Sequence, residues 1–181
     1  MTDNTTVLAR GRTQTAIMVA GFAIATALAA QVAIPIPGTP VPMALAPFAV
    51  LLAGLWLGPA AGAASMALYV AAGALGLPVF APLGAPGILR LIGPTGGYLL
   101  AYPAAAAVAG IVAQRFPRPA GRIAAAMTGM AVIHAGGVAQ LVLLTGSVTT
   151  AAALGSAPFV IGDLVKSVAA GLIAPRGAPR A

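Results

Sequence analysis

The stretch ALAPFAVLLAGLWLGPAAGAASMALYVAAGALG, residues 44–76, runs without a charged side chain for longer than one membrane crossing needs. A helix requires about 20 mainly apolar residues to span the hydrocarbon layer. Gly58 and Pro59 interrupt the stretch near its middle, and such a pair favours a tight turn. We therefore predict two transmembrane helices here, over about 44–57 and 60–76.

The remainder of the chain has the same apolar character. Of its 181 residues, 60% are hydrophobic and only 6% are charged, whereas soluble domains carry roughly a quarter charged residues. Four further apolar segments complete a bundle of six transmembrane helices and leave no length for a soluble domain. We expect an all-α integral membrane protein, a single membrane domain over residues 1–181, with its other crossings at about 14–34, 97–114, 122–144 and 159–174.

The basic residues indicate the orientation. The net charge of +7 would suggest nucleic acid in a soluble chain, but here the basic residues stand singly or in small groups between apolar segments, so we expect no nucleic acid partner. Six crossings with cytoplasmic amino and carboxyl termini satisfy the positive-inside rule. The residues then on the cytoplasmic side are Arg10, Arg12, Arg115, Arg118, Arg122, Arg176 and Arg180. Arg90 and Lys166 are the exceptions, and functional residues are expected there.

Asp163 and Lys166 stand three residues apart in the last predicted helix, so they share one face of it. Each charge costs about 2.5 to 3.5 kcal/mol at the centre of a membrane helix, so the pair is expected to face the bundle interior or a cavity. One interpretation is that the two charges only neutralise each other. The other is that they line a pocket open to the outside, where Asp163 accepts N–H groups of a ligand and Lys166 donates to its carboxylate or carbonyl.

Two more candidates lie in or beside the predicted outer loop at 77–96. Arg90 either binds a ligand carboxylate or is a solvated loop charge. The segment GPTGGY, residues 93–98, leads into the fourth predicted helix. Its glycines, Gly96 among them, allow a close approach of the backbone to a ligand, and Tyr98 is placed at the membrane boundary. A turn that starts a helix, followed by an interfacial aromatic residue, is an equally open interpretation.

The sequence offers little for catalysis or for a metal. It has no cysteine and a single histidine, so neither a thiolate site nor a histidine cluster can form. No nucleophile with an adjacent base is visible, and we expect no catalytic residue, no metal, no cofactor and no enzyme. His134, in the fifth predicted helix, either forms a hydrogen bond across helices or relays protons. The only lysine is not in a phosphate-binding loop of the Walker type, so the chain is not its own ATPase.

Several motifs follow one another in a characteristic order. They are PGTPVP at 37–42, FAVLLAG at 48–54 with LGP at 57–59, GLPVF at 76–80, GPTGGY at 93–98 and GDLVK at 162–166. This ordered set resembles the BioY family, the biotin-specific S components of energy-coupling-factor (ECF) vitamin transporters. The resemblance covers the chain from the first predicted helix to the sixth.

The resemblance implies a substrate-capture subunit in the bacterial cytoplasmic (inner) membrane, with a biotin pocket near the outer face closed by the loops at 35–42 and 77–96. The substrate-binding residues are then expected to be Asp163, Lys166, Arg90, Tyr98, Thr39, Gly96 and Phe80, with Phe48 and Tyr69 as further aromatic walls. Energy is supplied in that family by a transmembrane coupling protein and ABC-type ATPase subunits. Ala16 and Ala20 are implied to face the coupling protein.

Other functions remain open. An S component for another vitamin, such as riboflavin or thiamine, is disfavoured because aromatic residues for stacking make up only 5% of the chain. Some members of the family occur without dedicated partners, so a solitary biotin carrier is a second alternative. A self-sufficient channel or proton-coupled carrier is a third. Uptake into liposomes that lack any ATPase distinguishes these carriers from a partner-dependent subunit.

Overall fold

The computed structural model describes residues 4–175, which are helical apart from two very short strands and the connecting loops. The elements are α1 (Asn4–Gln31), β1 (Ala33–Ile34), β2 (Met43–Ala44), α2 (Ala46–Ala74), α3 (Leu89–Ile92), α4 (Gly96–Arg115), α5 (Pro119–Thr145), α6 (Val148–Gly155), the 3₁₀ turn η1 (Ala157–Phe159) and α7 (Val160–Ile173). Within the described residues, five helical segments are long and apolar enough to cross a membrane. The prediction of an all-helical, multi-pass membrane protein is confirmed at this level.

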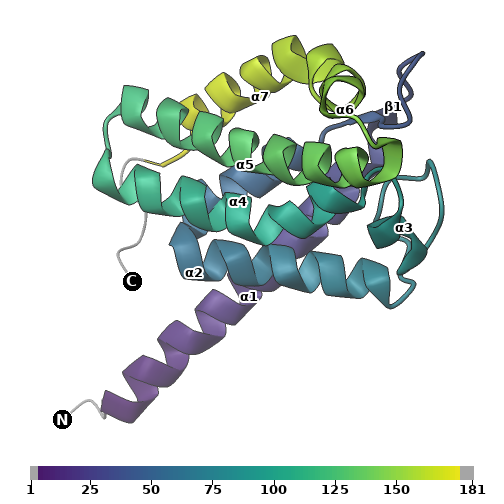
Figure 1. Cartoon of the computed structure of the whole chain (residues 1–181). Helices are drawn as coiled ribbons and strands as arrows, with labels where there is room; N and C mark the ends of the chain where they lie inside the picture. Colours follow the sequence, from purple (N-terminus) through teal and green to yellow (C-terminus); the bar gives the residue numbers. More distant parts are fainter. Residues whose placement is uncertain (1–3, 176–181) are drawn as a thin grey trace.

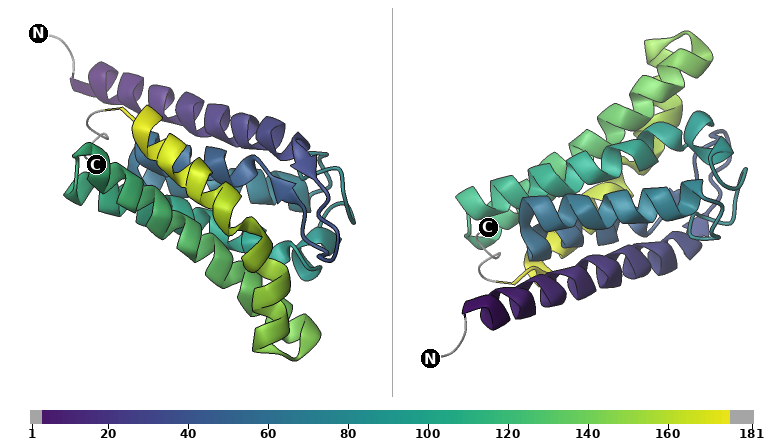
Figure 2. Two further views of the ribbon diagram at one scale, coloured as in Figure 1. Left: turned by 90° about the horizontal axis from the view of Figure 1, so that it is seen from above. Right: turned by 90° about the horizontal axis from the view of Figure 1, so that it is seen from below.

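The helices form a bundle in which α4 lies between α2 and α5 (Figure 1). Helix α1 packs along α2, and α7 packs on α5. Figure 2 shows the start of α1 and the end of α7 at one end of the bundle. The segments 32–45 and 75–95, which join α1 to α2 and α2 to α4, lie at the opposite end, called here the loop end.

Helix α2 is a hairpin of two helical arms rather than one straight rod. Gly58 leaves the helical conformation with φ 80° and ψ −178°, a region that favours glycine, and Pro59 follows it. A Cβ atom placed on Gly62 would lie 3.0 Å from the Cα atom of Gly54. In a straight helix these residues would be about 12 Å apart. The chain therefore turns back at the pair that the sequence marks as a tight turn.

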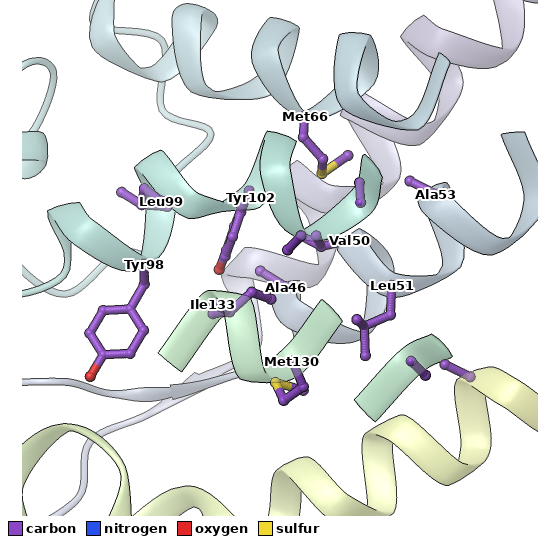
Figure 3. Packing of buried hydrophobic residues seen from close by; sticks show 14 of the residues in the cluster. Ala46, Val50, Leu51, Ala53, Met66, Tyr98, Leu99, Tyr102, Met130 and Ile133 are labelled. Carbon is purple, nitrogen blue, oxygen red and sulfur yellow. The ribbon is translucent and has the colours of Figure 1, made fainter. Parts of the chain in front are cut away.

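Small side chains allow the central helices to approach closely. Alanine residues of α2, α4 and α5 have no exposed surface, among them Ala53, Ala105, Ala106, Ala109, Ala125 and Ala126. Larger side chains fill the remaining space: Val50 and Leu51 of α2 lie among Tyr102 of α4 and Ile133 of α5 (Figure 3). Such small-residue contacts permit the close helix packing that stabilises a bundle in lipid, where burial from water gives no driving force.

The helix bounds depart from the predicted ones at the start of the chain, and one helix before the last was not predicted. Helix α1 begins at Asn4 rather than near residue 14, because no proline interrupts the polar residues before the apolar segment. Ahead of the last predicted crossing the structure has an additional helix, α6, which the sequence analysis missed. Ser147 is its N-cap and accepts a hydrogen bond from the Thr150 backbone N–H, a recognised start signal. Arg176 and Arg180 lie outside the described residues.

Candidate functional site

A cavity with about 690 Å³ of empty space, its open mouth included, lies among α1, α2, α4, α5, α7 and the segments of the loop end. Pockets for small ligands usually have mainly apolar walls with a few polar anchors. Five aromatic side chains line this cavity: Tyr69, Phe80, Tyr98, Tyr102 and Phe159. The walls suit a small, largely apolar molecule.

Asp163 and Lys166 form the centre of a polar cluster on the α7 side of the cavity. Lys166 Nζ lies 2.8 Å from Asp163 Oδ1, and the Asp163 side chain is only 10% exposed. Ser167 Oγ donates to the Asp163 backbone carbonyl at 2.7 Å, which fixes the α7 backbone beside the carboxylate. The two charges therefore neutralise each other and also line the cavity, and their binding to a ligand stays a prediction.

His134 completes this cluster from the neighbouring helix α5. Its Nε2 lies 2.8 Å from Asp163 Oδ2, and its Nδ1 lies 3.0 Å from Ser156 Oγ. The Tyr98 ring meets the imidazole edge-on, with centroids 6.3 Å apart, and the Tyr98 hydroxyl donates to the Gly155 carbonyl at 2.6 Å. The prediction of a hydrogen bond across helices is confirmed for His134.

Arg90 lies on α3 and is buried, with 6% of its surface exposed. Its Nε and Nη2 donate to the carbonyls of Ala85 and Ala81, both at 2.8 Å, and its Nη1 donates to that of Leu83. Burial lowers the pKa of the guanidinium, and the neighbouring Tyr69 acts in the opposite direction. The interpretation of Arg90 as a solvated loop charge is wrong, because this side chain organises the loop and lines the cavity.

Thr39 and Gly96 do not line the cavity, although the sequence analysis placed them among the binding residues. Thr39 Oγ1 donates to the Leu154 carbonyl at 2.7 Å and thereby ties the segment between β1 and β2 to α6. Gly96 starts α4 against the Leu91 carbonyl, where a Cβ atom has no room. Both residues shape the loops around the cavity.

Other predicted residues fall on both sides of the cavity boundary. Phe80, Tyr98 and Tyr69 line it, as expected of aromatic walls, and Tyr69 also contacts the Phe80 ring with centroids 5.6 Å apart. Phe48 packs against the hydrophobic core instead. Ala16 on α1 is exposed and Ala20 is half-buried, so this part of α1 offers a surface that the described chain does not cover.

The sequence analysis missed several residues of the site. Tyr102 lines the cavity one helical turn after Tyr98 and stacks on Tyr69, with centroids 6.1 Å apart. The spacing of four residues between two tyrosines was the available signal. Gln140 was also missed: its side-chain amide donates to the carbonyls of Leu91 at 2.9 Å and Gly93 at 2.7 Å, and so holds the start of α4 against α5.

The fold and the site together define a multi-pass helical membrane protein with a polar-anchored cavity for a small molecule at one end of its bundle. Residues 1–181 match the sequence profile of the BioY family, and the chain belongs to this family. The family that the ordered motifs indicate is thereby confirmed.

Relatives in other organisms support this assignment. The chain is 40% identical over 159 residues to a probable biotin transporter BioY of Pyrococcus horikoshii, covering 88% of this chain and 93% of that protein. It is 42% identical over 143 residues to the biotin transporter BioY of Thermotoga maritima, covering 79% and 84%. These relatives are transporters rather than enzymes, in agreement with the expectation of a non-enzymatic chain.

A solved structure has the same fold. It is a crystal structure of the S component for biotin from an ECF-type ABC transporter, with a TM-score of 0.82 and 24% sequence identity. The match covers 96% of this chain and 92% of the other. The two chains therefore share one helical architecture.

Proposed function

We propose that this chain is the substrate-capture (S) subunit of an ECF-type importer and that its cavity binds biotin. Biotin has a ureido ring with two N–H donors and one carbonyl, an apolar sulfur-containing ring and a carboxylate tail. The observation that carries the proposal is the set of polar anchors, Asp163, Lys166 and Arg90, in an otherwise aromatic and apolar cavity. The family and the names of the relatives support biotin as the molecule that these anchors hold.

The polar anchors lie on two walls of the cavity, Asp163 and Lys166 on α7 and Arg90 on α3. These two polar walls suit the two ends of biotin. Asp163 is an acceptor with lone pairs beyond those used by Lys166 and His134, so it can take a ureido N–H. Lys166 donates one of its three N–H groups to Asp163, and the others can donate to the ureido carbonyl. Arg90 has N–H groups that are not bound to the loop carbonyls, and these donate to the carboxylate of biotin.

We also propose six crossings: α1, the two arms of α2, α4, α5, and the segment from α6 to α7. This count agrees with the position of the α1 start and the α7 end at one end of the bundle (Figure 2). The turn between α4 and α5 lies at that same end (Figure 2). Arg115 is the last residue of α4 and Arg118 directly precedes α5, so the positive-inside rule places this end in the cytoplasm and the loop end outside. The chain is then a single domain of a bacterial cytoplasmic (inner) membrane.

The orientation is tested by labelling, because the chain has no cysteine of its own. Thr149→Cys places a thiol at the start of α6, and Pro117→Cys places one between α4 and α5. A membrane-impermeant maleimide applied to intact cells is expected to label the first variant and to label the second only after lysis. The opposite pattern would overturn the orientation.

The energising partners are proposed to be a transmembrane coupling protein and ABC-type ATPase subunits. The exposed face of α1 around Ala16 and Ala20 supports a contact with the coupling protein, because small residues permit close helix approach. Ala20→Trp is expected to leave biotin binding intact and to abolish energised uptake. Equal loss of both activities would show that Ala20 is needed for internal packing.

The first test of the function is equilibrium binding of labelled biotin to the purified chain in detergent, with riboflavin and thiamine as competitors. Saturable binding without ATP that neither competitor displaces is the expected result. Displacement by riboflavin or thiamine would favour an S component for that vitamin. Uptake of biotin into liposomes that contain this chain alone would instead support a solitary carrier.

A further inference from the structure

The polar cluster on the α7 side of the cavity includes His134, for which no contact with biotin is proposed above. His134 lies on α5 between Asp163 and Ser156, with its Nε2 2.8 Å from Asp163 Oδ2 and its Nδ1 3.0 Å from Ser156 Oγ. Its side chain is 19% exposed and lines the cavity. The titratable and charged groups that lie around it in the described structure are Asp163 and Lys166 of α7 and the phenols of Tyr98 and Tyr102 of α4.

The hydrogen-bond partners assign the tautomer of His134. The Asp163 carboxylate, paired with Lys166, can only accept hydrogen bonds, so the Nε2 atom that faces it must carry a proton. In the neutral imidazole the Nδ1 atom is then an acceptor, and the Ser156 hydroxyl donates to it. Asp163 therefore selects the tautomer in which His134 donates to it, and Ser156 holds the other ring nitrogen in place.

Two donors now hold the Asp163 carboxylate from different sides. Lys166 binds Oδ1 and His134 binds Oδ2, so the carboxylate cannot rotate without losing one of these hydrogen bonds. Each oxygen has two lone pairs, and one on each is taken. The acceptor positions that remain are fixed in direction before a ligand arrives, and such preorganisation reduces the cost of binding.

We infer that His134, oriented by Ser156, is a positioning residue that makes the Asp163 end of the cavity specific for ligands with N–H donors, such as the ureido ring of biotin. This inference rests on the proposed function and adds a determinant of specificity to it. His134 acts through Asp163, so its contribution concerns only ligands that donate to Asp163. Ligands that reach Arg90 and the apolar walls alone do not depend on it.

Three ligands separate this role from a structural one. Biotin and desthiobiotin both carry the ureido ring, whereas lipoate has a similar carboxylate tail and a sulfur-containing ring without any N–H donor. His134→Leu removes the donor to Asp163. We expect the affinity for biotin and for desthiobiotin to fall by roughly tenfold, which corresponds to the free energy of one hydrogen bond to a charged group. The affinity for lipoate, which is expected to be weaker, should stay unchanged.

Two further variants keep the inference testable if His134→Leu does not fold. His134→Gln retains a side-chain N–H that can reach Asp163, and biotin affinity is expected within about threefold of the unaltered chain. Ser156→Ala removes the hydroxyl that holds the Nδ1 side of the imidazole ring, and the ratio of lipoate to biotin dissociation constants is expected to fall by about threefold. All values come from displacement of labelled biotin from the purified chain in detergent.

The outcomes are distinct. A parallel loss of affinity for all three ligands, or no rescue by His134→Gln, would assign His134 a purely structural role and overturn the inference while leaving the proposed function intact. Failure of the unaltered chain to bind biotin would overturn the proposed function and the inference together. A selective loss of affinity for biotin and desthiobiotin supports both the proposed function and the inference.

Discussion

The two polar walls of the cavity are built in different ways. On the α5–α7 wall, side chains bind side chains: Asp163 accepts from Lys166 and from His134, all on long helices. On the α3 wall, a single side chain, Arg90, binds three backbone carbonyls of the loop at 81–85. The first wall is rigid because of its helices, and the second owes its shape to one guanidinium.

This difference separates two kinds of contribution to binding. A change on the α5–α7 wall is expected to alter the chemistry presented to a ligand and to leave the backbone in place, since α5 and α7 also pack through other residues. A change at Arg90 alters the loop as well, because the carbonyls of Ala81, Leu83 and Ala85 lose their donor together. The same loss of affinity should therefore have different structural signatures on the two walls.

The largest effect is expected for Asp163→Asn. The amide no longer balances Lys166, and it accepts hydrogen bonds more weakly than a carboxylate. A hydrogen bond to a charged group is worth about 1.5–3 kcal/mol, so the dissociation constant for biotin should rise by up to roughly 100-fold. Equilibrium binding measures it, and hydrogen exchange in the loop at 81–85 should not change.

The matched control for this variant is Ser167→Ala on the same helix. Ser167 bonds to the Asp163 backbone carbonyl and is not among the residues that line the cavity. Its removal should leave biotin affinity within about twofold, because Ser167 does not line the cavity. Only the free energy of unfolding should fall, by about 0.5–1.5 kcal/mol for a neutral hydrogen bond. Unchanged affinity in Asp163→Asn would show that the α5–α7 wall does not hold the ligand.

Arg90→Lys should have the next largest effect, and it tests the second wall. Lysine keeps the positive charge but cannot reproduce the planar fork that reaches three carbonyls. We expect biotin affinity to fall by about tenfold, with faster hydrogen exchange at 81–85. An affinity loss without any change in exchange would mean that Arg90 contributes only its charge and that the two walls do not differ.

The sequence predicts the α5–α7 wall much better than the α3 wall, and the reason is physical. Asp163 and Lys166 are charges in an apolar helix, and their energetic cost and their spacing identify them without any tertiary information. The hairpin turn at Gly58 is similarly local. His134 could be located on its helix, but its partners Asp163 and Ser156 depend on how α5 and α7 pack.

The loop end could not be derived in this way. Nothing in the spacing of Arg90 indicates that its donors go to the backbone of its own loop, because such bonds depend on the path of residues 81–87. Thr39 and Gly96 were predicted from motifs and contact other loops and helices instead of the cavity. Helix α6 was missed because Gly146, Gly155 and Pro158 around it favour turns, so no helix was predicted between the crossings at 122–144 and 159–174.

A smaller effect is expected for Gln140→Leu, because Gln140 shares one feature with each of the two walls. Its amide is on a long helix, α5, but its partners are the carbonyls of Leu91 and Gly93 at the loop end. Loss of both bonds should weaken biotin binding by about threefold and speed hydrogen exchange at 91–97. If exchange at 81–85 increases equally, the α3 wall extends to the start of α4 as one cooperative unit.

The smallest effect is expected for Thr39→Val, which removes the bond to the Leu154 carbonyl and the bond from the Val41 backbone N–H but keeps the shape of the side chain. Thr39 is outside both walls, so biotin affinity should change by less than about twofold. The stability of the chain in detergent should fall by about 2 kcal/mol, the usual net value of two such hydrogen bonds. Thermal unfolding with and without biotin measures both quantities on one sample. An affinity loss as large as that of Arg90→Lys would show that the segment between β1 and β2 acts on the ligand, and the cavity would then have a third wall.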